Sequence, residues 1–89
     1  MNTRTAAEFL GLIGNEKRLA ILKILLEGEM TVSVLAKEVA LRHSALSQHL
    51  AKLRAGDLVE SRKVSTLVWY SCNLDAVRRM LRALDGIFP

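Results

Sequence analysis

The sequence predicts one small, mostly helical domain with a single β-hairpin near its C-terminal end. Three observations support this fold class. Apolar residues before position 56 recur at the three- and four-residue spacing of amphipathic helices. Residues 58–72 change to a segment rich in β-branched and aromatic side chains, which is typical of strands. The only proline is the last of the 89 residues, so no proline interrupts these elements.

The first two helices are predicted over residues 5–14 and 16–27. Asn15 lies between them and is a favoured N-cap, and Glu16 follows in the first turn, where a carboxylate is stabilised. The second helix is apolar around nearly its whole circumference, which predicts that it is the most buried helix. Gly28 is expected to supply the left-handed residue with which helices often end.

A short third helix and a longer fourth helix follow. Thr31 is the expected N-cap of the third helix. The fourth is predicted over residues 43–55, where Leu46, Leu50 and Leu53 are spaced to form one apolar stripe. The rest of this helix is polar, small or basic. One face is therefore expected to pack and the other to stay open to solvent.

The C-terminal third of the chain is predicted as a hairpin followed by a helix. Residues 58–63 and 67–72 are the expected strands, with a turn at residues 64–66. Asn73 is expected to cap a last helix over residues 74–88, which has one apolar stripe and arginines on its opposite face. Such a helix needs a surface to lie against, and a second copy of the chain is the simplest candidate.

A homodimer is also predicted from the amount of apolar material in so short a chain. Hydrophobic residues make up 51% of it, which is more than a small interior can hide. We expect residues 1–89 to form one domain whose terminal helices, residues 5–14 and 74–88, make the dimer interface. The predicted interface residues are Phe9, Leu10, Ile13, Val77, Met80, Leu81, Leu84 and Phe88.

The cysteine content and the hydropathy pattern predict a cytoplasmic protein. The single cysteine, Cys72, allows no internal disulfide and no thiolate cluster within one chain. No window reaches the roughly 20 apolar residues that cross a bilayer, so no membrane partner is expected. Cys72 itself has two interpretations, a redox-sensitive thiol or a small buried residue at a strand end, and the second is favoured.

Positive charge gathers in the middle of the chain. The formal net charge is +4 and the sequence pI is about 9.7. Residues 1–39 balance five basic with five acidic side chains, whereas residues 40–66 hold five basic and two acidic ones. A local basic excess is expected on a surface that meets nucleic-acid phosphates.

The order of elements and this basic segment predict a winged helix-turn-helix that binds double-stranded DNA. One helix of that motif enters the major groove, so its outer face needs donors and acceptors rather than bulky apolar groups. The predicted DNA contacts come from helix 43–55 and from hairpin 58–72, which we call the wing. The predicted DNA-binding residues are Arg42, His43, Ser44, Ser47, Gln48, His49, Lys52, Arg62, Lys63 and Thr66.

Different roles are expected within this set. The Gln48 amide can form two hydrogen bonds with adenine, and the Arg42 guanidinium can do so with guanine. Arg62 and Lys63 lie on the hairpin and are expected to contact phosphates rather than bases. His49 has two interpretations, contact with DNA or packing against the neighbouring helix.

Three segments of the chain resemble the ArsR family of bacterial winged-helix repressors. They are residues 15–22 (NEKRLAIL), residues 44–54 (SALSQHLAKLR) and residues 58–62 (LVESR), the last leading to Trp69-Tyr70. The flanking elements extend the resemblance over essentially the whole chain. It implies a cytoplasmic homodimer, DNA contacts from the fourth helix and the wing, and repression that a signal relieves.

The chain departs from that family at its metal sites and at the wing tip. Metal-sensing members typically have a Cys-x-Cys pair at the start of the third helix, where this chain has Thr31-Val32-Ser33. Others bind zinc through the last helix, yet residues 74–88 contain no histidine. Neither site can form, so no metal and no cofactor are expected. Ser65 stands where the family often has glycine, which leaves the turn geometry open.

An enzyme and a protein-binding module are the alternatives to a DNA-binding regulator. Catalysis is disfavoured because Ser47 and His49 lie on opposite sides of a helix, and His43, which could reach Ser47, has no carboxylate to orient it. The second alternative is a winged-helix protein-protein interaction module without DNA binding. It predicts negligible DNA affinity, and a function that is unchanged when Gln48 or Arg62 is replaced by alanine.

Overall fold

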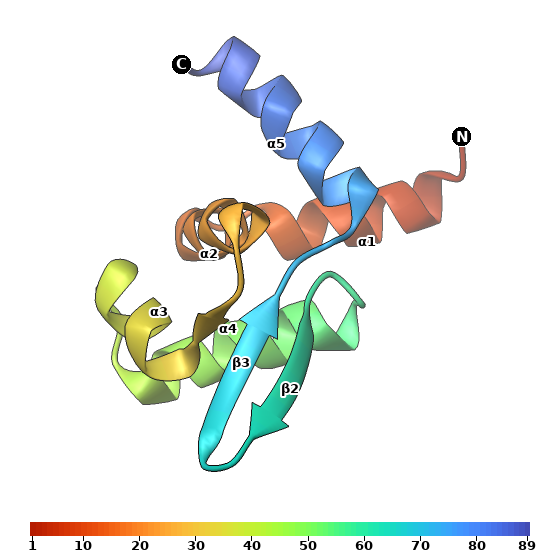
Figure 1. Ribbon diagram of the computed structural model, residues 1–89. Helices are drawn as coiled ribbons and strands as arrows, with labels where there is room; N and C mark the ends of the chain where they lie inside the picture. Colours follow the sequence, from red (N-terminus) through yellow and green to blue (C-terminus); the bar gives the residue numbers. More distant parts are fainter.

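The computed structural model describes residues 1–89, which form five helices and one three-stranded sheet. The elements are α1 (Thr3–Ile13), α2 (Glu16–Glu27), β1 (Met30–Thr31), α3 (Val32–Glu38), α4 (His43–Ala55), β2 (Glu60–Val64), β3 (Leu67–Ser71) and α5 (Asp75–Ile87). Figure 1 shows the β2–β3 hairpin projecting beyond α4, and α5 extending away from the body of the molecule. The predicted fold class, a winged helix-turn-helix, is confirmed.

Side-chain caps fix the starts of the first three helices. Asn15 accepts hydrogen bonds from two backbone N–H groups of α2, at 2.9 and 3.1 Å, as the sequence predicts. Thr31 caps α3 in the same way, at 3.3 Å. Helix α1 begins two residues earlier than predicted because Asn2 accepts a hydrogen bond from the N–H of Thr5 at 3.1 Å.

Two predictions about helix ends are wrong. Gly28 is extended, with φ of 167°, because the chain passes at once from α2 into β1. Asn73 does not cap α5, whose N-cap is Leu74 without a side-chain hydrogen bond. The helix starts one residue later than expected because the N–H groups of Val77 and Arg78 donate to the Leu74 carbonyl.

Helices α3 and α4 both end in a left-handed residue that is not glycine. After α3, the N–H of Ala40 donates to the Lys37 carbonyl at 3.2 Å, and the N–H of Leu41 donates to the Ala36 carbonyl at 3.0 Å. These two bonds define a Schellman motif, in which Ala40 has a φ of 54°. Asp57 occupies the same position after α4, with a φ of 61°. The turn between α3 and α4 is therefore held by hydrogen bonds to the last turn of α3.

Replacing Ala40 by glycine is expected to raise the free energy of unfolding by about 0.5–1 kcal/mol. A left-handed conformation costs an L-residue about 1–2 kcal/mol, and the larger entropy of glycine in the unfolded chain offsets about 0.4–1 kcal/mol of that gain. Denaturant unfolding measures the change. As a control, Ala51→Gly in the exposed interior of α4 should lower the stability by about 1 kcal/mol. A destabilised Ala40→Gly variant would contradict the expectation.

The sheet is antiparallel, with strand order β1-β3-β2. Strands β2 and β3 pair as far as Val64 and Leu67, so the turn has only two residues, Ser65 and Thr66, rather than the three predicted. Ser65 has a φ of 56°, which a two-residue hairpin turn requires and which glycine adopts at lower cost. The hairpin therefore closes tightly although its tip has no glycine.

Strand β1 was not predicted, and β2 starts later than predicted. Met30 and Thr31 pair with Tyr70 and Trp69, in the half of β3 away from the hairpin turn, which makes the sheet three-stranded. Leu58 and Val59, expected in the strand, are each only 3% exposed and belong to the core. They precede β2 because the segment that follows α4 first packs into the core, and the strand begins only where the chain reaches the surface.

The core lies between α2, α4 and the sheet. The core residues of α2 and α4 are Ile21, Leu22, Leu25, Leu46, Leu50 and Leu53. Helix α2 is the most buried of the long helices, as predicted, because only Glu16, Lys23 and Glu27 are exposed along it. Its second apolar face, with Leu19, Ala20 and Leu26, lines a groove of about 670 Å³ beside α5. No helix combines the length and apolar character needed to span a membrane.

Candidate nucleic-acid interface

Helix α4 has one buried apolar face and one open polar face, as the sequence predicts. The three leucines of its stripe are at most 1% exposed and fix the helix to the body of the molecule. Its other side is free of large apolar side chains and offers hydroxyl, amide and ammonium groups to solvent. The exposed residues of α4 are His43, Ser44, Ser47, Gln48, Ala51, Lys52, Arg54 and Ala55.

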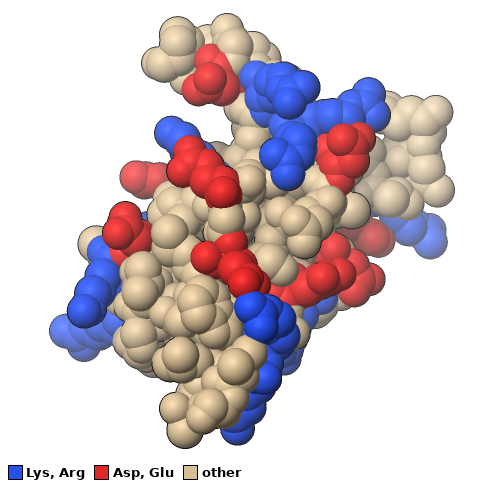
Figure 2. All heavy atoms as spheres, in the orientation of Figure 1, with Lys and Arg blue, Asp and Glu red and all other residues tan.

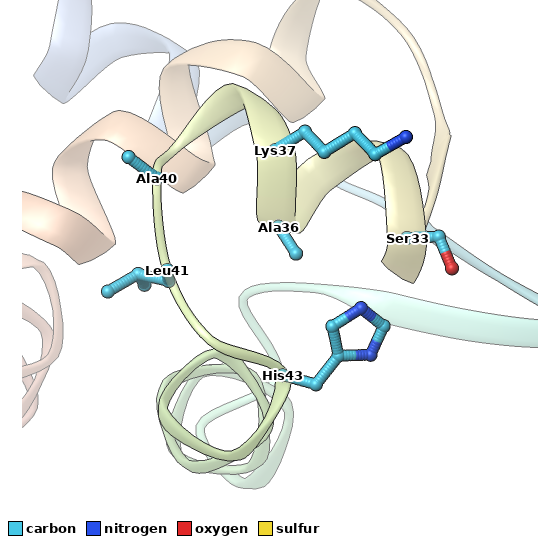
Figure 3. A pocket seen from close by; sticks show the side chains of 6 residues that line it. All are labelled: Ser33, Ala36, Lys37, Ala40, Leu41 and His43. Atoms are coloured by element: carbon cyan, nitrogen blue, oxygen red, sulfur yellow. The ribbon is translucent and has the colours of Figure 1, made fainter.

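The first turn of α4 borders a groove of about 550 Å³ that it shares with α3. The groove is lined by Ser33, Ala36, Lys37, Ala40, Leu41 and His43. Figure 3 shows Ala36 pointing from α3 into the gap, with Ser33 and His43 on one side of it and Leu41 on the other. Half of the lining side chains, those of Ser33, Ala36 and Ala40, are small, which leaves the groove open to an extended backbone.

The start of α4 is suited to an anion. Arg42 is the N-cap of α4 and makes no side-chain hydrogen bond to the helix, so the N–H groups of the first turn stay free. They form the positive end of the helix dipole, and Lys37 and His43 add donors at the same groove. Lys37 and Ser33 were not among the predicted contacts. The motif itself could have indicated them, because the helix before the reading helix crosses the DNA backbone.

The wing carries exposed polar residues at its tip, but Arg62 is engaged elsewhere. Lys63 and Thr66 are exposed. The Arg62 guanidinium donates to both carboxylate oxygens of Glu29, at 3.1 Å through Nε and 2.5 Å through Nη2, and lies 5.6 Å from the centre of the Trp69 ring. These hydrogen bonds hold the pKa of Glu29 below and that of Arg62 above the ordinary value. Arg62 thus connects β2 to Glu29, which precedes β1, and the Glu29 carboxylate compensates its charge.

His49 is turned away from the open face of α4. Its ring nitrogen Nδ1 lies 3.4 Å from Nη1 of Arg18 on α2, and the residue is half-buried. Burial lowers the pKa of His49, and the positive charges of Arg18 and Lys52 lower it further. Of the two interpretations that the sequence leaves open, this geometry matches packing against the neighbouring helix.

Basic side chains are spread along the wing and beside α3. Figure 2 shows Lys and Arg along the outer edge of the hairpin and a second group next to α3, with uncharged surface between them. Arg54 links α4 to the wing, because its Nη1 donates to Ser61 Oγ at 3.2 Å. This exposed hydrogen bond connects the last turn of α4 to the start of β2.

Cys72 lies in the core, where it is 2% exposed. Burial raises the pKa of its thiol above the ordinary value, so the protonated form is favoured and a reactive thiolate is not. This matches the favoured interpretation as a small buried residue at a strand end. No group of three or more His, Cys, Asp or Glu side chains is placed to hold a metal ion.

The predicted interface residues of α1 and α5 differ widely in exposure. Ile13 and Val77 are 3% and 0% exposed, so they belong to the core of the protomer and leave no surface for a partner. Leu10 and Phe88 are 51% and 73% exposed. The half-buried members of the set are Phe9, Met80, Leu81 and Leu84.

Sequence comparison places the chain among bacterial regulators. The family model described as "Bacterial regulatory protein, arsR family" matches residues 15–61, from the N-cap of α2 into β2. The nodulation protein NolR of Rhizobium meliloti is 49% identical over 83 residues, which cover 93% of this chain and 68% of that protein. The transcriptional activator HlyU of Vibrio cholerae is 39% identical over 87 residues, covering 98% and 81% of the two chains.

Solved structures agree with the sequence comparison. The crystal structure of NolR from Sinorhizobium fredii has a TM-score of 0.93 and 46% identity, covering 97% of this chain and 86% of that chain. The homodimeric winged helix-turn-helix DNA-binding domain of a possible regulator from Mycobacterium bovis, solved by NMR, has a TM-score of 0.84 and 27% identity, covering 96% and 79%.

Proposed function

The chain belongs to the ArsR family of bacterial DNA-binding transcription regulators, and we propose that it acts as a homodimer that binds an approximately palindromic DNA site and represses transcription there. The observation that carries the proposal is the open polar face of α4, anchored from beneath by three buried leucines. A helix with such a face, in second place in a helix-turn-helix, can lie in the major groove. A DNA target also implies that the protein works in the cytoplasm.

The dimer is proposed to form through α1 and α5. Leu10 and Phe88 expose apolar side chains on these helices, and the groove between α2 and α5 leaves further apolar surface uncovered. Exposed apolar residues that lie together on a small domain are typical of a protein-protein contact. The related M. bovis domain is homodimeric, which supports a dimer of this chain.

In this dimer the two α4 helices would enter successive major grooves, about 34–36 Å apart on one side of the duplex. Gln48 and Ser47 lie on the open face and are proposed to contact base edges. Lys52, Lys63 and the groove beside Lys37 are proposed to contact phosphates. A dimer bound within a promoter would block access of RNA polymerase.

Selection of binding sites from random DNA duplexes tests the proposal. The wild-type protein is expected to enrich a palindrome with a half-site spacing of about one helical turn. Gln48→Ala should still enrich a palindrome but lose the preference at one position in each half-site, since a bidentate contact contributes about 1–3 kcal/mol of discrimination. Arg79→Ala, on the polar face of α5, is the matched control and should select the wild-type sequence. If no sequence is enriched, the proposal fails, and a winged-helix module that binds protein is favoured instead.

A further inference from the structure

The Arg18 side chain connects three helices. Its Nε donates to the Leu12 carbonyl at 2.6 Å and its Nη2 to the Gly11 carbonyl at 3.3 Å, both in the last turns of α1. Its Nη1 lies 3.4 Å from Nδ1 of His49 on α4. One guanidinium on α2 therefore bridges the C-terminal end of α1 and the inner side of α4.

A second contact joins the same two helices. The side chain of Leu12 occupies the space that a Cβ on Gly56 would fill, at the C-cap of α4. Leu12 therefore provides its carbonyl to Arg18 and its side chain to the end of α4. His49 and Gly56 are about two helical turns apart, so α1 is fixed to α4 at two separate points.

We propose that Arg18 is a positioning residue that sets the placement of α4 relative to α1, with His49 as its acceptor on α4. The inference rests on the proposed function, in which α1 belongs to the dimer interface and α4 reads DNA. In such a dimer, the distance between the two α4 helices depends on how each is held to its own interface helix. Recognition needs that placement to hold within about 0.5 Å, so loss of the bridge should weaken DNA binding.

The bridge requires the neutral form of His49. A guanidinium has donors only, so Nδ1 of His49 must offer a lone pair. The charged groups that act on the ring are Arg18 from α2 and Lys52 from α4 itself, and both are cations. Together with burial they keep the pKa of His49 below its ordinary value of 6.5, so the acceptor form prevails at neutral pH.

An NMR titration of the His49 ring tests the contact without DNA. Arg18→Met removes the donors and the charge but keeps an aliphatic side chain. We expect the pKa of His49 to rise in this variant, because a neighbouring cation is lost, and the backbone amide signals of α4 to shift. Lys23→Met, which removes a cation from an exposed position of α2, is the matched control and should change neither. An unchanged His49 titration with unchanged α4 signals in Arg18→Met would overturn the proposal.

Affinity for the selected duplex tests the consequence for recognition. Arg18→Met and His49→Leu should each weaken binding about tenfold, as expected when a hydrogen bond to a charged group is lost. His49→Gln keeps an acceptor oxygen and should remain within about threefold of the wild type. The double variant Arg18→Met/His49→Leu should bind no more weakly than Arg18→Met, because His49→Leu removes only a contact that Arg18→Met has already removed. Additive losses would overturn the proposal.

The pH dependence of binding separates positioning from a general loss of stability. Once the pH falls below the pKa of His49, which burial and the cations Arg18 and Lys52 hold below its ordinary value, the ring becomes protonated and can no longer accept from Arg18. The wild type should then lose affinity relative to His49→Gln, with His43 present in both proteins. Identical pH profiles would overturn the proposal. If the wild type selects no duplex at all, the proposed function fails, while the NMR titration still decides whether Arg18 positions α4.

Discussion

Raising the salt concentration from 50 to 200 mM is expected to weaken DNA binding by the dimer about 10³–10⁵-fold. Each phosphate that a cation neutralises releases bound counterions, so affinity falls with salt in proportion to the number of such contacts. Lys37, Arg42, Lys52 and Lys63 are exposed near α4, its groove and the wing, which gives about eight cations per dimer. Fluorescence anisotropy with a labelled duplex at several salt concentrations measures the slope.

Two variants make the salt experiment specific. Lys52→Ala should reduce the slope of log affinity against log salt by about 2 per dimer, because each lost phosphate contact contributes about 0.9 and the dimer has two copies. Arg79→Ala removes an equal charge from the exposed polar face of α5 and should leave the slope unchanged. A flat salt response of the wild type would favour a winged-helix module that binds protein.

The elements that the sequence predicted well are those with a local signal. Helix α4 was predicted with its observed bounds because Leu46, Leu50 and Leu53 repeat at helical spacing. Helix α2 begins where Asn15 indicates. Strand β1 has two residues, too few to show a period, and it forms only because β3 lies beside it in the folded chain.

The left-handed residues show that glycine does not always mark the end of a helix. Glycine was expected to mark the left-handed position after a helix, yet Gly28 is extended while Ala40 and Asp57 are left-handed. After α3 and α4, the hydrogen bonds of the Schellman motif and the packing of the following leucine against the core fix the conformation whatever the residue. Neither interaction can be read from a single position of the sequence.

Exposure along one helix could be predicted from the sequence, whereas contacts between residues far apart in the chain could not. The open face of α4 follows from the position of its apolar stripe. Arg62 was predicted to contact phosphates, and His49 to contact DNA or to pack against the neighbouring helix. Their partners Glu29 and Arg18 are 33 and 31 residues away in the chain. Sequence spacing gives no sign of such pairs. The groove between α3 and α4 could not be predicted from the sequence either, because it forms only when the turn at Ala40 brings the two helices together.

One glutamate at an exposed apolar position of α1 or α5 is expected to raise the dissociation constant of the dimer at least about 100-fold. Leu10→Glu and Phe88→Glu change side chains that are 51% and 73% exposed in the protomer, so each protomer should keep its fold. In the proposed dimer either carboxylate would be buried without a partner, which costs several kcal/mol. Sedimentation velocity over a concentration series measures the shift from dimer to monomer.

Ala83→Glu is the matched control, because it adds the same charge to α5 on the side away from its apolar stripe. It should sediment as the wild-type dimer. The two interface variants should also lose affinity for the palindrome, since a monomer contacts only one half-site. If Leu10→Glu and Phe88→Glu remain dimeric at wild-type concentrations, the subunits meet through another surface. The two reading helices would then need a different spacing from the one proposed.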